Sequence, residues 1–265
     1  MIFVISLRDE IERRDLIRKK MDDLSMGFEF IDAIDLRKSN SSSRLVDVES
    51  VNKNIHRNMA NVEIACALSH RLVYRTILDR GLAGAFVFED DVIIDDDFSF
   101  VNNWFLNNAN SFRDSPVIVH LGVSSRKHMN ALLLRPIDMA GGEKFKLWNL
   151  IQKFSDEAWG AYAYYINSAL ASKILNQKMV VTVADQWSVL TGGGEGCIKI
   201  VSPACCSHPE SSASSFLEKG RVVAKYQYLK CFYKDPFVLL GWVYRKTLIK
   251  FIIRPLLRKW HGAYS

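Results

Sequence analysis

Hydrophobic and polar positions along the chain follow two patterns, short apolar or alternating runs and longer segments with a helical repeat. The runs predict buried strands, and they lie at residues 1–7, 28–34, 85–94, 116–122 and 159–166. The helical segments lie between them, at residues 8–24, 61–80, 98–107 and 167–175. Strands that alternate with helices predict an α/β fold that opens with a βαβ unit and has a mostly parallel central sheet.

Other segments give weaker or local signals. Asn61 is expected to cap the helix that runs to residue 80. Residues 37–58 are rich in serine and asparagine, which predicts a mobile surface loop, and residues 124–156 are expected to form loops or an insertion. Residues 191–194 contain three glycines but lack the Lys-Ser/Thr of a phosphate-binding loop, so a flexible connection is expected there.

The chain has 265 residues, of which 49% are hydrophobic, enough for one large domain or a domain with an appendage. Its net charge of +6 is uneven, because residues 221–265 carry ten Lys or Arg and a single acid, whereas residues 1–220 carry 25 basic and 28 acidic side chains. We therefore divide the chain into an α/β domain at 1–220 and a basic, apolar segment at 221–265.

The basic segment predicts an amphipathic helical tail. Its apolar runs are interrupted by Arg245, Lys246 and Lys250, so a membrane-spanning helix is not expected, and a segment lying in the plane of an anionic membrane fits better. A helix pair packed on the domain remains an alternative. Nucleic acid ranks lower as a partner, because aliphatic residues dominate and no groove-reading motif is present.

Cysteines and the amino terminus indicate the compartment. The five cysteines are odd in number and form no CxxC pair, which indicates free thiols in a reducing compartment. The apolar run at residues 1–7 ends at once in Arg8, Asp9 and Glu10, so it predicts a first strand rather than a signal peptide.

Three consecutive acids, Glu89, Asp90 and Asp91, follow directly on the apolar strand at residues 85–88. Carboxylates that leave water are costly unless they are paired or bind a metal, so this strand end predicts a cation or proton-transfer site. Alternation along a strand would put Glu89 and Asp91 on one side and Asp90 on the other. A solvated strand end is the alternative. Residues 95–97, also acidic, are expected to form a solvated turn at a helix N-terminus.

In their order and spacing, several stretches resemble glycosyltransferase family 25, which includes bacterial lipooligosaccharide and lipopolysaccharide galactosyltransferases. The matching stretches are residues 4–7 with Arg13 and Arg14, 30–33, 63–70, 88–91, 120–122, 160–162 and Asp185. The resemblance spans about residues 1–215. Ala65 stands where the family usually has glycine, and residues 39–43 and the basic tail are outside the shared pattern.

The resemblance implies a GT-A fold and an enzyme that inverts the anomeric centre. It further implies transfer from a UDP-hexose, with galactose as the default and glucose as the alternative, to a lipooligosaccharide, lipopolysaccharide or related glycan. Such a reaction needs a divalent cation, Mn²⁺ or Mg²⁺, to stabilise charge on the diphosphate leaving group, and oxygen ligands suit these ions. The enzyme would work in the cytoplasm, peripherally on the inner face of the bacterial inner membrane.

Residue roles follow from the same resemblance. Asp91 is the principal expected metal ligand, with Glu89 assisting and His208 completing the set. The nucleotide sugar would be bound by Leu7, Arg8, Arg14, Asp32, Ala33, Ser69, His70 and Asp90. For His70, a structural hydrogen bond within its helix is the alternative.

Asp185 is the expected base for the acceptor hydroxyl, because it is a lone acid in a strand-like apolar context. Capping of the next helix or support of the metal ligands is the alternative for Asp185. Two other functions remain open, a metal-dependent phosphoester hydrolase and a non-catalytic membrane adaptor. The hydrolase is disfavoured because no second histidine-rich cluster is present to complete a two-metal site.

Overall fold

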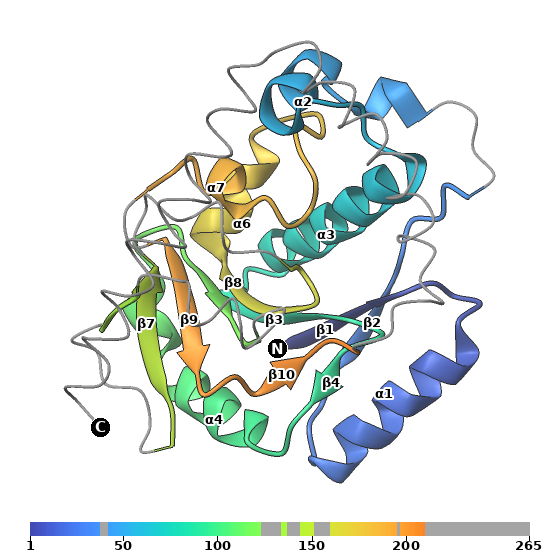
Figure 1. Ribbon diagram of the computed structural model, residues 1–265. Helices are drawn as coiled ribbons and strands as arrows, with labels where there is room; N and C mark the ends of the chain where they lie inside the picture. The colour runs from blue at the N-terminus through green and yellow to red at the C-terminus, as the bar shows by residue number, and fades with distance from the viewer. Residues whose placement is uncertain (38–41, 123–133, 137–143, 151–159, 195–196, 210–265) are drawn as a thin grey trace, which may run out of the picture.

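A computed structural model describes residues 1–37, 42–122, 134–136, 144–150, 160–194 and 197–209. These residues form a central sheet that is covered by helices on both faces (Figure 1). The predicted basic tail and the predicted boundary at residue 220 lie outside the described residues.

The central sheet has eight described strands in the order β2-β1-β3-β8-β5-β9-β7-β6. Their bounds are β1 Ile2–Ser6, β2 Glu29–Asp32, β3 Gly84–Glu89, β5 Ile118–His120, β6 Leu134–Pro136, β7 Lys146–Leu150, β8 Ala163–Asn167 and β9 Ile198–Ser202. All of them run in one direction except β8 and β7, which are antiparallel to their neighbours. The sheet is therefore mostly parallel by strand direction, as predicted, although its pairings are mixed.

The central sheet separates two hydrophobic cores, and helices cover the core on each face. The described helices are α1 Ile11–Asp23, α2 Val48–Ile55, α3 Asn61–Asp79, α4 Phe98–Asn108, α6 Ser168–Leu175 and α7 Trp187–Leu190, with short 3₁₀ turns at Ser42–Leu45 and Ala109–Phe112. Helices α2, α3, α6 and α7 cover one face, and α1 and α4 cover the other (Figure 1). Strands β1 and β8 are buried along their whole length, because both of their faces meet a core.

The opening βαβ unit is confirmed, since β1 and β2 are parallel neighbours joined by α1. The helices expected near residues 8–24, 61–80, 98–107 and 167–175 are confirmed as α1, α3, α4 and α6. One cap was wrong by a residue: α3 is capped at Ala60, whose N–H donates to the Glu63 carboxylate at 3.0 Å.

Three predictions from pattern were wrong. Residues 37–58 hold α2, which forms because Asp47 accepts from the Ser50 N–H at its start and Val51 is buried in the core. The segment 124–156 was expected to form loops or an insertion, and it supplies β6 and β7, so the loop alternative was wrong. The strand-like residues 183–187 form a turn that leads into α7, and the sheet instead gains β9, which the pattern did not single out.

A second, two-stranded sheet lies beside the end of β3. Strand β4 (Ile93–Ile94) pairs antiparallel with β10 (Cys206–Ser207), and Ser207 faces Ile93 across the pair. Gly122, at the end of β5, makes this approach possible, because a Cβ there would lie 2.1 Å from the Cys206 carbonyl oxygen. The pairing brings residue 208 back toward residue 91, which is 117 positions earlier in the chain.

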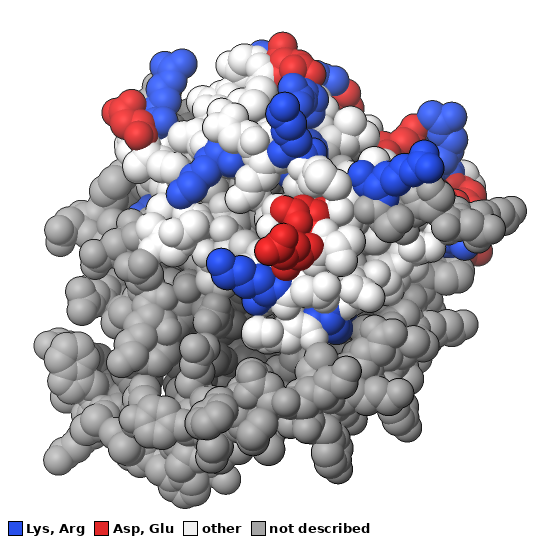
Figure 2. Space-filling view, turned by 90° about the horizontal axis from the view of Figure 1, so that it is seen from above, with Lys and Arg blue, Asp and Glu red and all other residues white. Residues whose placement is uncertain are grey.

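On the face that Figure 2 shows, basic and acidic side chains of the described residues are interspersed among uncharged ones. Among the residues that the structure describes, no helix has the length and apolar character needed to cross a membrane. The four described cysteines, Cys66, Cys197, Cys205 and Cys206, form no disulfide, as expected.

Candidate functional site

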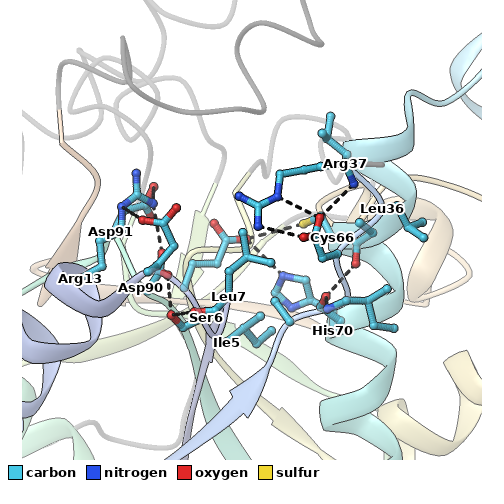
Figure 3. A pocket seen from close by; sticks show the side chains of 18 residues that line it. Ile5, Ser6, Leu7, Arg13, Leu36, Arg37, Cys66, His70, Asp90 and Asp91 are labelled. Carbon is cyan, nitrogen blue, oxygen red and sulfur yellow. Dashed lines mark hydrogen bonds and ion pairs between the residues drawn. The ribbon is translucent and has the colours of Figure 1, made fainter. Parts of the chain in front are cut away.

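A pocket opens where the parallel strands β1, β2 and β3 end, beside the first half of α3. Its lining includes residues 5–7 at the end of β1, 33–37 after β2 and 89–91 at the end of β3. Side chains of α3 between residues 62 and 70 also line the pocket. Ligands of α/β sheets bind at this edge, outside the carboxyl ends of the strands. The pocket includes the acidic strand end, Glu89 to Asp91, for which the sequence predicted a site (Figure 3).

Five of the eight predicted nucleotide-binding residues line this pocket. They are Leu7, Ala33, Ser69, His70 and Asp90. The Ser69 hydroxyl accepts from the Ile34 N–H at 2.8 Å and donates to the Ala65 carbonyl at 2.7 Å, so Ser69 fixes the backbone after β2. Ala33 is held in the same way, because its N–H donates to the Ser6 carbonyl at 2.8 Å.

Arg8, Arg14 and Asp32, the other three, bind one another instead. Arg14 is buried and donates to the Ser6 carbonyl at 3.0 Å and to Asp32 Oδ1 at 2.5 Å. The exposed Arg8 donates to Asp32 Oδ2 at 2.6 Å. Hydrogen bonds from Arg8 and then Arg14 lower the pKa of Asp32. These residues tie the ends of β1 and β2 together beside the pocket.

The acidic turn does not follow the alternation that its sequence predicted. Strand β3 ends at Glu89, and Asp90 and Asp91 lie in the turn that follows. Both of these aspartates face Arg13, with Nη1 to Asp90 Oδ1 at 3.1 Å and to Asp91 Oδ2 at 4.0 Å. The expectation that Asp90 points away from Asp91 was therefore wrong, because the strand period does not continue into a turn.

Asp90 is held by two donors. The Ser6 hydroxyl donates to its Oδ2 at 2.7 Å, and Arg13 donates to its Oδ1. Burial raises the pKa of Asp90, and the hydrogen bonds from Ser6 and Arg13 offset only part of that rise. The Asp90 carboxyl group thus lies at the carboxyl end of β1, where a ligand bound in the pocket would contact it.

Asp91 pairs with His208, as the sequence predicted for a shared site. His208 Nε2 lies 3.2 Å from Asp91 Oδ2, and the β4–β10 pairing is what delivers it. Burial would raise the pKa of Asp91, but the hydrogen bond and charge of His208 outweigh it and lower that pKa. The hydrogen bond to Asp91 correspondingly raises the pKa of His208.

The donor set at this turn fits a hard divalent cation. Asp91 Oδ1 is buried and has no hydrogen-bond partner among the described residues, which is costly for a carboxylate oxygen. A cation bound to Asp91 would remove that cost, and His208 stands beside it as a second ligand. Asp91 and His208 are thus the predicted ligands that the structure brings together.

Glu89, the third predicted ligand, turns toward α3. Its Oε1 lies 3.1 Å from His70 Nε2 and 3.8 Å from the Cys66 Sγ, which donates to it. Behind His70, the Tyr164 hydroxyl lies 2.6 Å from Nδ1 and 2.9 Å from the hydroxyl of Tyr74. Figure 3 shows Cys66 and His70 on one side of the pocket and Asp90, Asp91 and Arg13 on the other.

Asp185, the predicted base, lies in the turn before α7 rather than on a strand. It is half-buried, is not one of the residues that line the pocket, and acts electrostatically on Arg57, whose guanidinium binds Glu63 at the start of α3. Its role as a base stays a prediction. Residues 95–97 are exposed and directly precede α4, which confirms the expected solvated helix start.

Sequence reasoning assigned no site role to Cys66, Ser6, Arg13 or Tyr164. A signal was present for Cys66, because it precedes His70 by four residues and therefore lies on the same face of α3. Ser6 and Arg13 lie within or beside the stretches that carried the family resemblance. Tyr164 had no local signal, because strand pairing from β3 to β8 places it behind His70.

Comparisons with known proteins agree with the resemblance. Residues 1–187 match the family described as glycosyltransferase family 25 (LPS biosynthesis protein). Over 231 residues the chain is 29% identical to the lacto-N-neotetraose biosynthesis glycosyltransferase LgtE of Neisseria meningitidis serogroup B, which covers 83% of this chain and 78% of that protein.

Two further relatives match over shorter shares of their own length. The lipooligosaccharide biosynthesis protein lic2B of Haemophilus influenzae is 30% identical over 92 residues, 35% of this chain and 34% of that protein. The procollagen galactosyltransferase 1-A of Xenopus laevis is 25% identical over 185 residues, 68% of this chain and 28% of that protein.

Proposed function

The chain belongs to glycosyltransferase family 25 and is a glycosyltransferase, and from this we propose that it moves a hexose from a UDP-sugar to a lipooligosaccharide, lipopolysaccharide or related glycan, with inversion of the anomeric centre. One observation carries the proposal. A pocket at the carboxyl ends of three parallel strands is bordered by Asp91, whose buried Oδ1 has no hydrogen-bond partner among the described residues. The helices on both faces of the sheet support a GT-A arrangement.

Galactose is the sugar we propose, with glucose as the alternative. The name of the Xenopus relative, a galactosyltransferase, supports galactose. The name of lic2B, a lipooligosaccharide biosynthesis protein, supports a lipooligosaccharide acceptor, and the name of LgtE, a lacto-N-neotetraose biosynthesis glycosyltransferase, supports a glycan acceptor. Measuring transfer from UDP-galactose, UDP-glucose and UDP-N-acetylglucosamine in parallel identifies the donor.

Each group of site residues has a role in this reaction. Asp91 and His208 would hold Mn²⁺ or Mg²⁺, and the bound ion would stabilise negative charge on the departing diphosphate. Ser69 and Arg14 fix the backbone that surrounds the nucleotide. Asp90, oriented by Ser6 and Arg13, is placed to accept a hydrogen bond from a ribose hydroxyl.

The chemical step is a single displacement. The acceptor hydroxyl oxygen forms a bond to the anomeric carbon while the bond from that carbon to the diphosphate oxygen breaks. The proton of the hydroxyl must pass to a base on the opposite side from the leaving group, and we propose Asp185 for this role.

Binding of UDP and Mn²⁺ to the full chain tests this function. We expect Mn²⁺ to strengthen UDP binding by about 10-fold or more, because both would occupy one site and a coupling of this size is typical of linked ligands. Isothermal titration with UDP, with and without Mn²⁺, measures the effect. Independent binding of the two would contradict the transferase proposal, and absence of UDP binding would favour the hydrolase or the adaptor.

The basic segment at 221–265 lies outside the described residues, and its membrane role is a proposal from sequence. We expect a chain truncated after Gly220 to bind anionic liposomes at least about 10-fold more weakly, because each basic residue near such a surface contributes about 1 kcal/mol. Co-sedimentation with phosphatidylserine vesicles measures this, with phosphatidylcholine vesicles as the control. Equal binding by a folded truncation would refute peripheral membrane attachment.

A further inference from the structure

Three side chains of different chemistry meet at the inner end of the pocket, away from Asp91. Cys66 and His70 are four residues apart on α3 and so project from one face of the helix. Glu89, the last residue of β3, lies against both of them. The cysteine Sγ, a histidine ring nitrogen and a glutamate oxygen all lie within 4.8 Å of one another.

The spacing of these atoms matches a tetrahedral metal site. Zinc bonds of about 2.3 Å to sulfur and about 2.0 Å to nitrogen and oxygen place tetrahedral ligand atoms about 3.3–3.6 Å apart. The observed separations are 3.1 Å for His70 Nε2 to Glu89 Oε1 and 3.8 Å for Cys66 Sγ to the same oxygen. These two separations lie within about 0.3 Å of the tetrahedral values, and the sulfur and the histidine nitrogen, which lie within 4.8 Å of each other, would move together on binding.

The surroundings of His70 also fit a metal ligand. Its ring is almost fully buried, and its second nitrogen, Nδ1, is bound by the Tyr164 hydroxyl at 2.6 Å, which in turn contacts Tyr74. A hydrogen bond at the nitrogen that does not bind the metal, here Nδ1, orients a ligating histidine so that the other nitrogen, here Nε2, faces the ion.

We propose that Cys66, His70 and Glu89 form a zinc site with a fourth position open to the pocket. Three protein ligands with one open position are the arrangement of zinc sites that bind a further ligand. The Cys66 thiolate gives this site a different metal preference from the site at Asp91 and His208, because sulfur favours zinc whereas carboxylate oxygens suit Mn²⁺ and Mg²⁺. Binding would release the proton of the Cys66 thiol.

This assignment places Glu89 in the zinc site instead of the hard-cation site. Its carboxylate oxygen already faces His70 and Cys66, whereas Asp91 has its contact with His208. All three zinc ligands line the pocket, so an ion there would meet whatever the pocket binds. The inference concerns metal binding by the free protein and does not depend on the transferase reaction.

Titration of the metal-free full chain with Co²⁺, in the absence of nucleotide, tests the site. We expect a thiolate-to-cobalt charge-transfer band that saturates at one Co²⁺ per chain, whatever Co²⁺ binds beside Asp91, and that disappears when Zn²⁺ replaces the Co²⁺. Cys66→Ser should remove the band, and Cys197→Ser, the same change at a buried cysteine elsewhere, should keep it. Tyr164→Phe should weaken Zn²⁺ binding by about 10-fold, as loss of a histidine's outer partner does.

Asp91→Asn separates the two metal sites. This variant should keep the thiolate band while losing any Mn²⁺ bound beside His208. The zinc result can therefore be interpreted even if the transferase proposal fails. Three results would overturn the inference: cobalt binding without the band in the unaltered chain, a band that survives in Cys66→Ser, or a band that disappears in Asp91→Asn.

Discussion

Replacing Asp91 by asparagine is expected to abolish cation-dependent transfer from a UDP-sugar, lowering kcat/KM by about 100-fold or more. The reason is the loss of a charged ligand from an ion that supplies several kcal/mol of stabilisation to the departing diphosphate. Asparagine keeps the shape of the side chain, and the change removes the charge of a carboxylate whose buried Oδ1 has no partner in the part of the chain that the structure describes. Steady-state rates with Mn²⁺ and the best UDP-sugar measure the effect.

Asp96→Asn is the matched control for that variant. Asp96 is five residues further along, its side chain is 91% exposed, and it forms a surface ion pair with Lys20, a type of contact worth about 0–1 kcal/mol. Its activity should stay within about twofold of the unaltered chain. If Asp91→Asn kept full activity with an unchanged far-ultraviolet circular dichroism spectrum, Asp91 would not be a metal ligand.

Local patterns were sufficient for the elements whose partners are close in sequence. Strands β1 and β2 and helix α1 are adjacent, and the helical repeats of α3, α4 and α6 have clear boundaries, so their positions were predictable. Strand order was not, because β8 lies between β3 and β5 through pairings that join segments about 45 to 80 residues apart. Strands β6, β7 and β9 were missed because their sequence pattern is weak, and β9 also depends on pairing with the distant strands β5 and β7.

The candidate site shows the same division. A site at the acidic end of β3 was predictable from the sequence, and His208 was assigned to the metal with Asp91 only as what the family resemblance implies. The directions of Asp90 and Asp91 were not predictable, because β3 stops at Glu89 and the strand period does not continue into the turn. The buried chain from His70 through Tyr164 to Tyr74 depends on the antiparallel pairing of β8 with β3, which no local feature revealed.

Asn167 secures the strand that carries Tyr164, and its replacement should produce the largest loss of stability we expect. It is 1% exposed and ends β8. Its Oδ1 accepts from the N–H groups of Val117 and Leu170 at 3.0 Å, and its Nδ2 donates to the carbonyls of Phe112 and Ser115 at 2.5 and 2.7 Å. One side chain therefore caps α6 and fixes the entry to β5.

Asn167→Ala should lower the free energy of unfolding by about 3 kcal/mol, because it removes a helix cap, worth about 1 kcal/mol, and leaves buried backbone groups unpaired at about 1–3 kcal/mol each. Urea unfolding followed by circular dichroism measures the change, compared at equal slope. Asn107→Ala, which removes an exposed contact to the Asn103 carbonyl within α4, should change stability by no more than about 0.5 kcal/mol. Similar losses for the two variants would mean that the four buried hydrogen bonds of Asn167 do not hold β8 in place.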